Sequence, residues 1–456
     1  MMGIPDIATI RDTLSRVAKV DLDNGSAPDI ETAVARLRGH RIGVTAGPEI
    51  AASAPHQAAL LTVVNIARRY ALGGVTVEGD LDVPLLVAGD RSRSLAEEVA
   101  AQGGQRGMPG DDEVTVIVGA PTRRPMRGVA LTFEGWRGGV VPPEAARLTE
   151  RTTVMPAAVL AGAFASAEAF AMLRGEAEAG YKAVGLSLWR PGRTAHWMQP
   201  ESDGPPLEAL PDNLWILGLG HLGQAFLWAL LMCPYANRSA VRLVLQDVDT
   251  VTGSTESTSI LTQDGMSGAM KTRAVAGVLE RHGFRTTLIE RPFDDGFRRR
   301  AADDPAVLIC GVDNLLARSQ IEGPGFPFVV EAGIGDSAQD FRSIRLHTFP
   351  ASRRAADLWV SGSARRVADL DRPGYRRLSE AGSDVCGLTR LAETAVGAPF
   401  VGTVTACLML GQVLRLLAGD APDALVDLDL RSVRSRRAVR NDVIEPFNPG
   451  YQGLEA

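Results

Sequence analysis

Two kinds of hydrophobic run alternate along the chain. Short apolar runs, such as 214–217 and 306–309, have the length of buried β-strands, whereas longer ones, such as 155–173 and 399–416, have the length of helices. Strands that alternate with helices predict an α/β fold with a mainly parallel sheet. We therefore expect Rossmann-like, doubly wound domains.

The order of these runs repeats once, at a period of roughly 220 to 240 residues. The strand-like segment TVIVGAP at 115–121 corresponds to AVLICGVD at 306–313, and the helix-like run at 155–173 corresponds to that at 399–416. The chain is therefore predicted to be an internal duplication of two related α/β domains.

The predicted boundaries follow from a polar, Pro- and Gly-bearing stretch at 194–210 and from an insertion that only the second half carries. We expect a first domain over 1–205 and a second over 206–430, in which 350–398 is a long crossover loop. The tail, 431–456, is basic and then Pro-bearing, and is typical of a solvated arm.

A glycine motif opens the second domain. The strand 214–217 is followed by Gly218, Gly220 and Gly223 in G-x-G-x-x-G spacing, then by a helix-like run and a second strand that ends in Asp247 and Asp249. In this order the glycines allow phosphate to approach the backbone, the helix N-terminus attracts the anion, and an acid can bind a ribose. The motif predicts a nucleotide site, for either NAD or ATP.

The first domain has TAGPEIAASA where the second has GLGHLGQAFL. Because the glycine triplet is absent, we expect the first domain to have lost its nucleotide site.

Composition narrows the class of protein. A net charge of -6 over 456 residues argues against nucleic acid as the main partner, and the four cysteines form no C-x-x-C pair typical of a structural zinc site. Neither a signal peptide nor an uninterrupted apolar run of membrane-spanning length is evident. We expect a cytoplasmic protein without membrane contact.

Three further residues are candidates for chemistry. Lys271 is one of only three lysines and opens a predicted helix, from which it can reach phosphates. Asp313 follows a predicted strand, where a carboxylate can bind magnesium, although Asp313 or Asn314 could equally cap the next helix. Cys386 lies in a polar stretch before the last apolar helix, a setting that favours a thiolate.

Taken together, these motifs resemble the superfamily of ubiquitin-activating (E1-like) enzymes and ThiF, in its two-half form with one inactive adenylation domain. The resemblance covers roughly 206–430 and rests on GLGHLG at 218–223, DVD at 247–249, GAMK at 268–271, CGVDN with Arg318 at 310–318, and PFVGTVTACLML at 399–410. In addition, CGLTR at 386–390 is similar to the Cys-x-x-Thr-Arg stretch of autophagy-type activating enzymes.

The resemblance implies a role for each of these residues. Gly218, Gly220 and Gly223 would cradle ATP and Asp247 would hold the ribose, with the neighbouring Asp249 also among the cofactor-binding residues. It further implies that Lys271 contacts the phosphates, Asp313 holds Mg²⁺, and Cys386 takes the activated carboxylate as a thioester.

The implied partners are a ubiquitin-like protein as substrate and a conjugating (E2-like) enzyme that accepts the thioester. A homodimer is compatible with the family, and a bacterial conjugation pathway in phage defence is its suggested setting.

One part of the family pattern is missing. Members usually carry S-N-L-x-R-Q after the acid pair, whereas this chain has STESTS at 254–259, with Thr255 in place of the Asn and Thr258 in place of the Arg. Loss of one phosphate-binding charge commonly costs on the order of 10²–10³ in rate. Either another arginine substitutes, for which Arg11 and Arg273 are the candidates, or the enzyme is slow or inactive.

Three other functions stay open at this point. The chain could adenylate without thioester transfer, as in sulfur-carrier activation or cyclic dehydration, in which case Cys386 would be dispensable. It could be a nicotinamide-dependent oxidoreductase, since the glycine motif alone allows one, or a catalytically inactive binding scaffold, which the missing S-N-L-x-R-Q favours.

Overall fold

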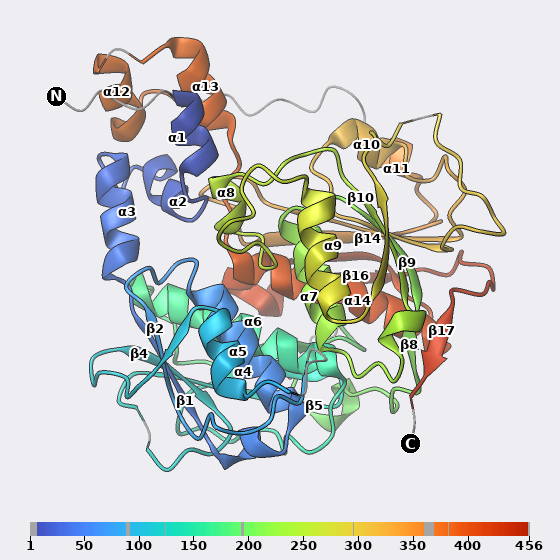
Figure 1. Cartoon of the computed structure of the whole chain (residues 1–456), viewed down its shortest axis with the longest axis horizontal. Helices are drawn as coiled ribbons and strands as arrows, with labels where there is room; N and C mark the ends of the chain where they lie inside the picture. The colour runs from blue at the N-terminus through green and yellow to red at the C-terminus, as the bar shows by residue number, and fades with distance from the viewer. Residues whose placement is uncertain are drawn as a thin grey trace.

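The computed structural model describes residues 7–87, 92–123, 125–192, 196–294, 296–359, 369–381 and 383–454. These residues form two halves, each built around one large β-sheet (Figure 1). The predicted pair of Rossmann-like α/β domains is therefore confirmed.

The sheet of the first half has seven strands in the order β3-β2-β1-β4-β5-β6-β7. Strands β1 to β5 are parallel, and β6 and β7 join antiparallel at one edge. The strands are β1 Ile42–Ala46, β2 Val75–Glu78, β3 Gly104–Arg106, β4 Val114–Val118, β5 Gly128–Glu134, β6 Arg137–Val141 and β7 Val184–Ser187, and the helices are α1 Ile7–Thr13, α2 Ala18–Asp23, α3 Ile30–Gly39, α4 Ala54–Ala67, α5 Leu95–Ala101 and α6 Met155–Leu173.

The sheet of the second half repeats that order and adds one strand, giving β11-β10-β9-β12-β13-β14-β15-β16. Strands β9 to β13 are parallel and β14 to β16 antiparallel. This shared order confirms the internal duplication.

The second half also contains β8 and β17, which lie outside the large sheet. Its strands are β8 Ala209–Pro211, β9 Asn213–Leu217, β10 Arg242–Gln246, β11 Arg285–Ile289, β12 Val307–Cys310, β13 Phe328–Ile334, β14 Ser343–Phe349, β15 Asp423–Asp429, β16 Arg437–Arg440 and β17 Tyr451–Gly453, and its helices are α7 His221–Met232, α8 Gly253–Glu256, α9 Lys271–Arg281, α10 Leu315–Ser319, α11 Ala355–Leu358, α12 Pro373–Glu380, α13 Val385–Glu393 and α14 Pro399–Leu417.

The two halves meet through four apolar helices. Helix α4 packs on α6, and α14 packs on both α7 and α6. Helices α6 and α14 are long and apolar enough to cross a bilayer, which the sequence reading did not anticipate, but 89% of each apolar window is buried inside the protein. Both are core helices, and burial on all sides explains why their sequences are apolar all round.

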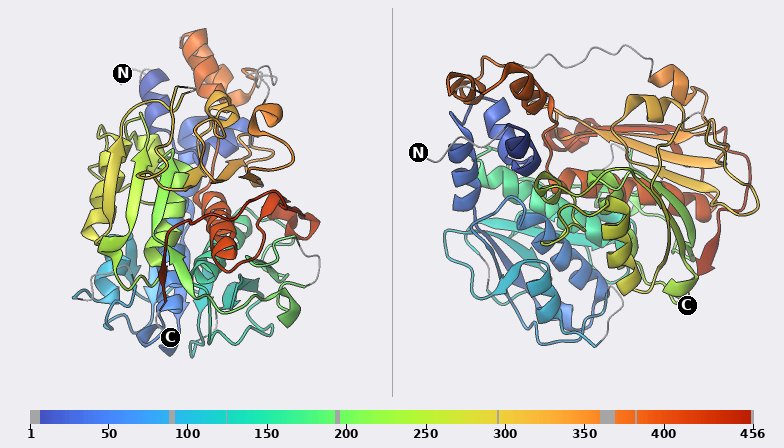
Figure 2. Two further views of the ribbon diagram at one scale, coloured as in Figure 1. Left: turned by 90° about the vertical axis from the view of Figure 1, so that its right-hand side faces the viewer. Right: turned by 45° about the horizontal axis from the view of Figure 1, so that its top comes forward.

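The crossover insertion folds onto the N-terminal segment. Helix α13 packs against α1 and α12, and α12 also contacts α2 (Figures 1 and 2). Helices from opposite ends of the chain thus form one cluster at the outer end of the molecule.

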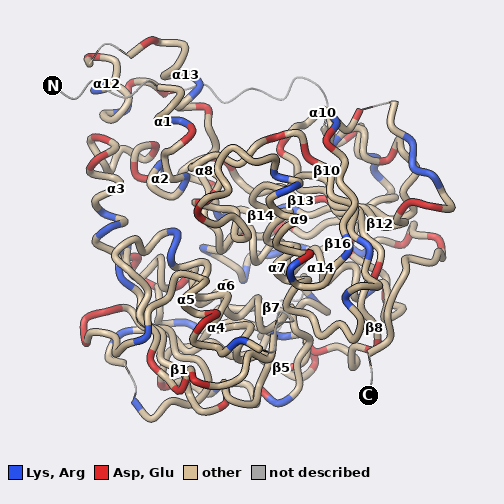
Figure 3. The backbone as a smooth tube through the Cα atoms, viewed as in Figure 1, with Lys and Arg blue, Asp and Glu red and all other residues tan. Residues whose placement is uncertain are grey.

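The tail is not a free arm, which corrects the expectation from its composition. Strand β16 pairs with β15 at the edge of the second sheet, and β17 pairs with β8. Acidic and basic residues are interspersed over both halves in the view of Figure 3.

Candidate active site

The glycine loop connects β9 to α7 at the carboxyl end of the central strand. Gly218 has φ +87°, a left-handed conformation that favours glycine, and a Cβ at Gly223 would lie 1.9 Å from the carbonyl oxygen of Gly218. A Cβ at Gly220 would meet nothing within 4 Å. Two of the glycines are therefore required by the turn, while the third leaves open space beside the N-terminus of α7.

The predicted acids lie beside this loop. One carboxylate oxygen of Asp247 accepts the N–H of Leu219 at 2.6 Å, and the other accepts the N–H of Asp249 at 2.8 Å. The carboxylate of Asp249 in turn pairs with Nζ of Lys271 at 2.8 Å. The structure thus brings the loop, both acids and the lysine together at one edge of the sheet.

Lys271 is the first residue of α9, and its position is fixed by the backbone. Its N–H donates to the carbonyl of Asp249 at 2.9 Å, and Thr250 forms a bridge with Met270. The Lys271 side chain is 14% exposed and the Asp249 side chain is 63% exposed. The ammonium is therefore largely shielded, while the carboxylate that it pairs with is open to solvent.

Asp313 reaches the same edge from the neighbouring strand. Strand β12 pairs with β9, and the N–H of Gly311 donates to the carbonyl of Leu217 at 2.9 Å. Asp313 is exposed, whereas the side chain of Asn314 accepts from the N–H groups of Leu316 and Ala317 and caps α10. Asn314 rather than Asp313 therefore caps α10, and the Asp313 carboxylate does not accept these two N–H groups.

In the segment 253–262, Thr255 and Thr258 stand at the two positions where the family pattern has Asn and Arg. Thr255 bonds back to Thr252, with 3.0 Å between their hydroxyl oxygens, and Thr258 is 7% exposed. Both threonines therefore serve the shape of this segment.

Two arginines of the first half hold this segment in place. Arg68 pairs with Glu256 at 3.0 Å, and Arg69 donates to the carbonyls of Ile260 and Thr262 at 2.9 and 3.1 Å. Arg69 is 4% exposed, and burial lowers its pKa.

Arg16, which the sequence reading missed, lies at the crevice. Its backbone N–H donates to the hydroxyl of Ser257 at 3.0 Å, and its guanidinium donates to the carbonyl of Ala395 at 2.9 Å. Burial lowers the pKa of Arg16, and the negative charge of Asp313 is the largest influence that raises it. Because Arg16 is separated from the motifs by some two hundred residues of chain, local spacing gives no signal for it.

The two arginines expected from the sequence pair with other acids. Arg11 pairs with its neighbour Asp12 at 3.2 Å, and Arg273 pairs with Glu290 at 2.7 Å with its side chain 66% exposed. Arg11 also lies close enough to Arg16 for its charge to lower the pKa of Arg16.

His221, the first residue of α7, adds no charge to the loop. Its pKa is lowered to about 4, chiefly by burial, with a smaller contribution from the neighbouring charges of Arg16 and Arg69. Its Nε2 has no hydrogen-bond partner among the described residues. The imidazole is therefore neutral at physiological pH.

Cys386 is exposed, as expected, on the first turn of α13, where the carboxylate of Asp384 accepts the N–H of Gly387 at 2.6 Å. The other three cysteines are buried. Helix α13 sits in the outer cluster with α12 and α1, apart from β9 and α7 (Figures 1 and 2). The structure therefore does not bring Cys386 to the glycine loop.

A cavity of about 250 Å³ lies over the antiparallel part of the second sheet. On its wall, the guanidinium of Arg318 lies 4.6 Å from the ring of Trp359, which belongs to the crossover insertion. The fully buried carboxylate of Glu331 pairs with Arg318 and with His347. The lining residues are Arg318, Gly333, Ile334, Gly335, Ser343, Ile344, Arg345, His347, Trp359 and Asp427.

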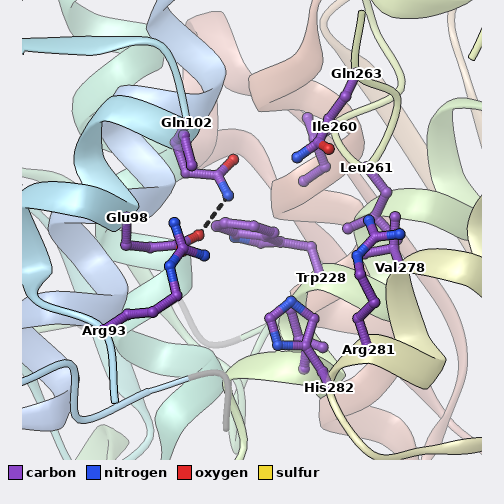
Figure 4. Close-up of a pocket in the computed structure, with 12 residues that line it drawn as sticks. Arg93, Glu98, Gln102, Trp228, Ile260, Leu261, Gln263, Val278, Arg281 and His282 are labelled. Carbon is purple, nitrogen blue, oxygen red and sulfur yellow. Dashed lines mark hydrogen bonds and ion pairs between the residues drawn. The ribbon is translucent and has the colours of Figure 1, made fainter. Parts of the chain in front are cut away.

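A smaller cavity, of about 140 Å³, lies where α5 of the first half faces α7 and α9 of the second (Figure 4). Trp228 lies at its centre, between Gln102, which donates to Glu98 at 2.6 Å, and Val278 on the other side. None of the predicted site residues lines it.

Most of the chain is similar to known proteins. Residues 41–188 match the family model described as the BilD N-terminal domain, and residues 210–420 match the BilD C-terminal domain. The bacterial E1-like protein BilD of Collimonas sp. (strain OK412) is 43% identical over 415 residues, covering 89% of each chain.

Solved structures resemble the chain more distantly. Escherichia coli MccB is 14% identical, with 54% of this chain and 67% of that chain covered and a TM-score of 0.34. PaaA is 16% identical, with 52% and 65% covered and a TM-score of 0.33. Scores this low support no inference about activity.

Both domain models and a relative with high identity over most of the chain agree on one assignment. The chain belongs to the BilD family of bacterial E1-like proteins.

Proposed function

We propose that this protein uses ATP to activate the C-terminal carboxylate of a small ubiquitin-like protein. The observation that carries the proposal is the meeting of the glycine loop, Lys271, Asp313 and Arg16 at one edge of the second sheet. Loop N–H groups and two cations match the phosphates of a nucleotide, and Asp247 can accept from a ribose hydroxyl.

Asp313 would hold Mg²⁺ together with the phosphates. No group of three or more metal-ligating side chains occurs among the described residues. A magnesium ion on a nucleotide needs only one or two protein carboxylates, because phosphate and water oxygens complete its shell, so a single exposed aspartate fits. The ion would neutralise charge that develops on the phosphates.

The first reaction would form an acyl adenylate. A carboxylate oxygen of the substrate bonds to the α-phosphorus of ATP while the bond from that phosphorus to pyrophosphate breaks. Lys271 and Arg16 would stabilise the charge that grows on the phosphate oxygens, and Arg16 would replace the arginine missing at Thr258.

The cavity beneath Trp359 is our candidate for the end of the substrate. Gly333 leaves room there, since a Cβ at that position would meet the guanidinium of Arg318 at 2.8 Å. Arg318 and Arg345 line the cavity, which suits a peptide that ends in a carboxylate.

The second reaction would transfer the acyl group to Cys386. The thiol gives its proton to solvent, the sulfur bonds to the acyl carbon, and the bond from that carbon to AMP breaks. A conjugating enzyme would then accept the thioester. Because α13 lies apart from the glycine loop, this step requires that the bound substrate move toward the outer cluster.

We also propose that the first half has no nucleotide site. In place of an open crevice, the carboxylate of Glu49 accepts the N–H of Ala120 at 3.0 Å, and a Cβ at Gly119 would meet it at 2.3 Å. A fixed carboxylate at the end of β4 would repel a phosphate. The first half would then supply Arg16, Arg68 and Arg69 and a rigid platform.

Adenylation without thioester transfer is the second candidate. The separation of α13 from the glycine loop favours it, because no movement is then needed.

Pyrophosphate exchange tests the adenylation step, which both candidates share. We would measure ATP–pyrophosphate exchange with a panel of small ubiquitin-like proteins, for the natural protein and for Lys271→Met, Asp313→Ala and Cys386→Ala. We expect substrate-dependent exchange that falls by about a hundredfold in the first two variants and persists in Cys386→Ala. Equal exchange in all four proteins would refute the assigned site.

A further inference from the structure

Helix α2 is short, charged and completely buried. All six of its residues, AKVDLD, are buried, although three of them, Lys19, Asp21 and Asp23, carry charges. Their exposures are 1%, 3% and 4%. A buried charge is tolerated where ion-pair or hydrogen-bond partners hold it in a defined geometry. The partners of these three side chains therefore show which parts of the molecule α2 connects.

On one side, α2 is fixed to the body of the first half. The carboxylate of Asp21 pairs with Arg174 at 2.7 Å and with Arg36 at 3.4 Å. Arg174 directly follows the long core helix α6. Asp21 therefore anchors α2 to the core of the first half.

On the other side, α2 holds the crossover helices. The ammonium of Lys19 donates to both carboxylate oxygens of Asp23, at 2.8 and 2.7 Å, and to the carbonyl of Ala392 in α13 at 3.1 Å. The hydroxyl of Tyr375 in α12, itself 3% exposed, donates to Asp23. Two of these contacts, from Lys19 to Ala392 and from Tyr375 to Asp23, join the first half to the two helices of the cysteine-bearing insertion.

Arg16 is held by other groups: its N–H donates to Ser257, and its guanidinium donates to the carbonyl of Ala395, which follows α13 in the crossover insertion. The side chains of Lys19, Asp23 and Tyr375 take no part in these two bonds, so they can be substituted without removing either bond.

We infer that Lys19, with Asp23 and Tyr375, is a positioning residue that holds the Cys386 helix on the first half for thioester formation. The inference rests on the proposed function, because the place of α13 matters only if Cys386 accepts the acyl group. Buried ion pairs add little net stability compared with apolar side chains of similar size, but they select one arrangement of the elements that they join. Misplacement of a reacting group by about 1 Å can cost a hundredfold in rate.

The test is a triple variant, Lys19→Met with Asp23→Leu and Tyr375→Phe, which removes the three side-chain polar groups together. Two rates are measured on the full chain with the same ubiquitin-like protein: pyrophosphate exchange and formation of the thiol-sensitive Cys386 adduct. We expect exchange within about threefold of the natural protein and adduct formation slower by about tenfold or more. Hydrogen exchange at the amides of 385–393 is expected to accelerate, as loosened docking requires.

The matched control is Arg415→Met with Asp423→Leu, which removes an equally buried ion pair between α14 and β15. Here we expect the ratio of adduct formation to exchange to be unchanged. An unchanged ratio in the triple variant as well would overturn the inference, whereas absence of the adduct in the natural protein would instead refute the proposed thioester step.

Tyr375→Phe alone provides the measurement if the triple variant does not fold. It removes one hydroxyl and leaves the Lys19–Asp23 pair intact, and we expect adduct formation to slow by about threefold with exchange unchanged. Equal effects on both rates would contradict the positioning role.

Discussion

At the scale of residues, Asp247 shapes the glycine loop before any nucleotide binds. Its two carboxylate oxygens accept the N–H groups of Leu219 and Asp249, so one side chain fixes both the loop and the acid that pairs with Lys271. Such prior organisation lets the loop N–H groups and the ammonium act on phosphate charge without reorganising during the reaction.

Lys271 provides the first residue-scale prediction. Under the proposed function, Lys271→Met removes an ammonium that would contact the phosphates, and we expect the rate of adenylation to fall by on the order of 10²–10³. The control is Lys182→Met, since Lys182 also pairs with an acid, Glu178, at 2.6 Å but lies in the first half. Stopped-flow or radiolabel measurement of pyrophosphate release compares them. A loss of the same size in both variants would contradict the role given to Lys271.

His221 provides a prediction about pH. Its pKa is about 4 in the folded protein and near its ordinary value of 6.5 when unfolded, so the unfolded chain binds the proton more readily. The stabilising contribution is complete above pH 6.5 and is lost progressively as the pH falls toward 4. At pH 5 this loss is about 2 kcal/mol.

Urea unfolding checks this prediction at pH 7.5 and pH 5 for the natural protein and for His221→Asn, which does not titrate. We expect the free energy of unfolding of the natural protein to fall by about 2 kcal/mol more than that of the variant. Parallel behaviour of the two proteins would mean that His221 does not titrate with a depressed pKa.

At the scale of elements, the end of α4 in the first half shapes the segment that replaces the missing family motif. Arg69 binds the carbonyls of Ile260 and Thr262 while buried, and Arg68 pairs with Glu256 closer to solvent. Arg69 is buried and Arg68 is partly exposed, so substitutions at these two adjacent positions compare a buried contact with a partly exposed one.

We expect Arg69→Met to lower the free energy of unfolding by about 3 kcal/mol, because it removes the donor to the carbonyl of Glu256 and to the side-chain oxygen of Asn65 at a buried site. Arg68→Met should cost less than about 1 kcal/mol, as exposed ion pairs do. Chemical denaturation measures both. Similar losses in the two variants would show that burial does not distinguish them.

At the scale of the whole molecule, the features that could be predicted are those that local patterns of residues encode. Hydrophobic runs identified the strands, and the spacing of Gly218, Gly220 and Gly223 with Asp247 identified the loop and its acid. Their meeting with Asp313 followed from the rule that carboxyl ends of parallel strands share an edge.

What escaped prediction depends on contacts between distant parts of the chain. Nothing near Arg16 in the sequence indicates that it lies beside Asp313, and nothing in α2 predicts that Lys19 reaches the crossover helices. The strands of the basic tail were missed because β16 is a sheet edge, where exposed arginines replace the apolar alternation of a buried strand.

The whole-molecule prediction concerns stoichiometry. Because the Glu49 carboxylate accepts the N–H of Ala120 and would repel a phosphate there, calorimetric titration of the protein with a non-hydrolysable ATP analogue and Mg²⁺ should give one site per chain. Lys271→Met should weaken that site, and a second site unaffected by this substitution would show that the first half also binds nucleotide.

The most direct test of the account is the covalent product itself. The protein would be incubated with ATP, Mg²⁺ and small glycine-tailed ubiquitin-like proteins, including the true partner, and resolved on a non-reducing gel with intact-mass confirmation. The account predicts an adduct that thiols remove, that requires ATP, and that disappears in Cys386→Ala. An adduct that survives in Cys386→Ala, or its absence from the natural protein, would contradict thioester transfer. Absence of both adduct and pyrophosphate release would contradict activation altogether.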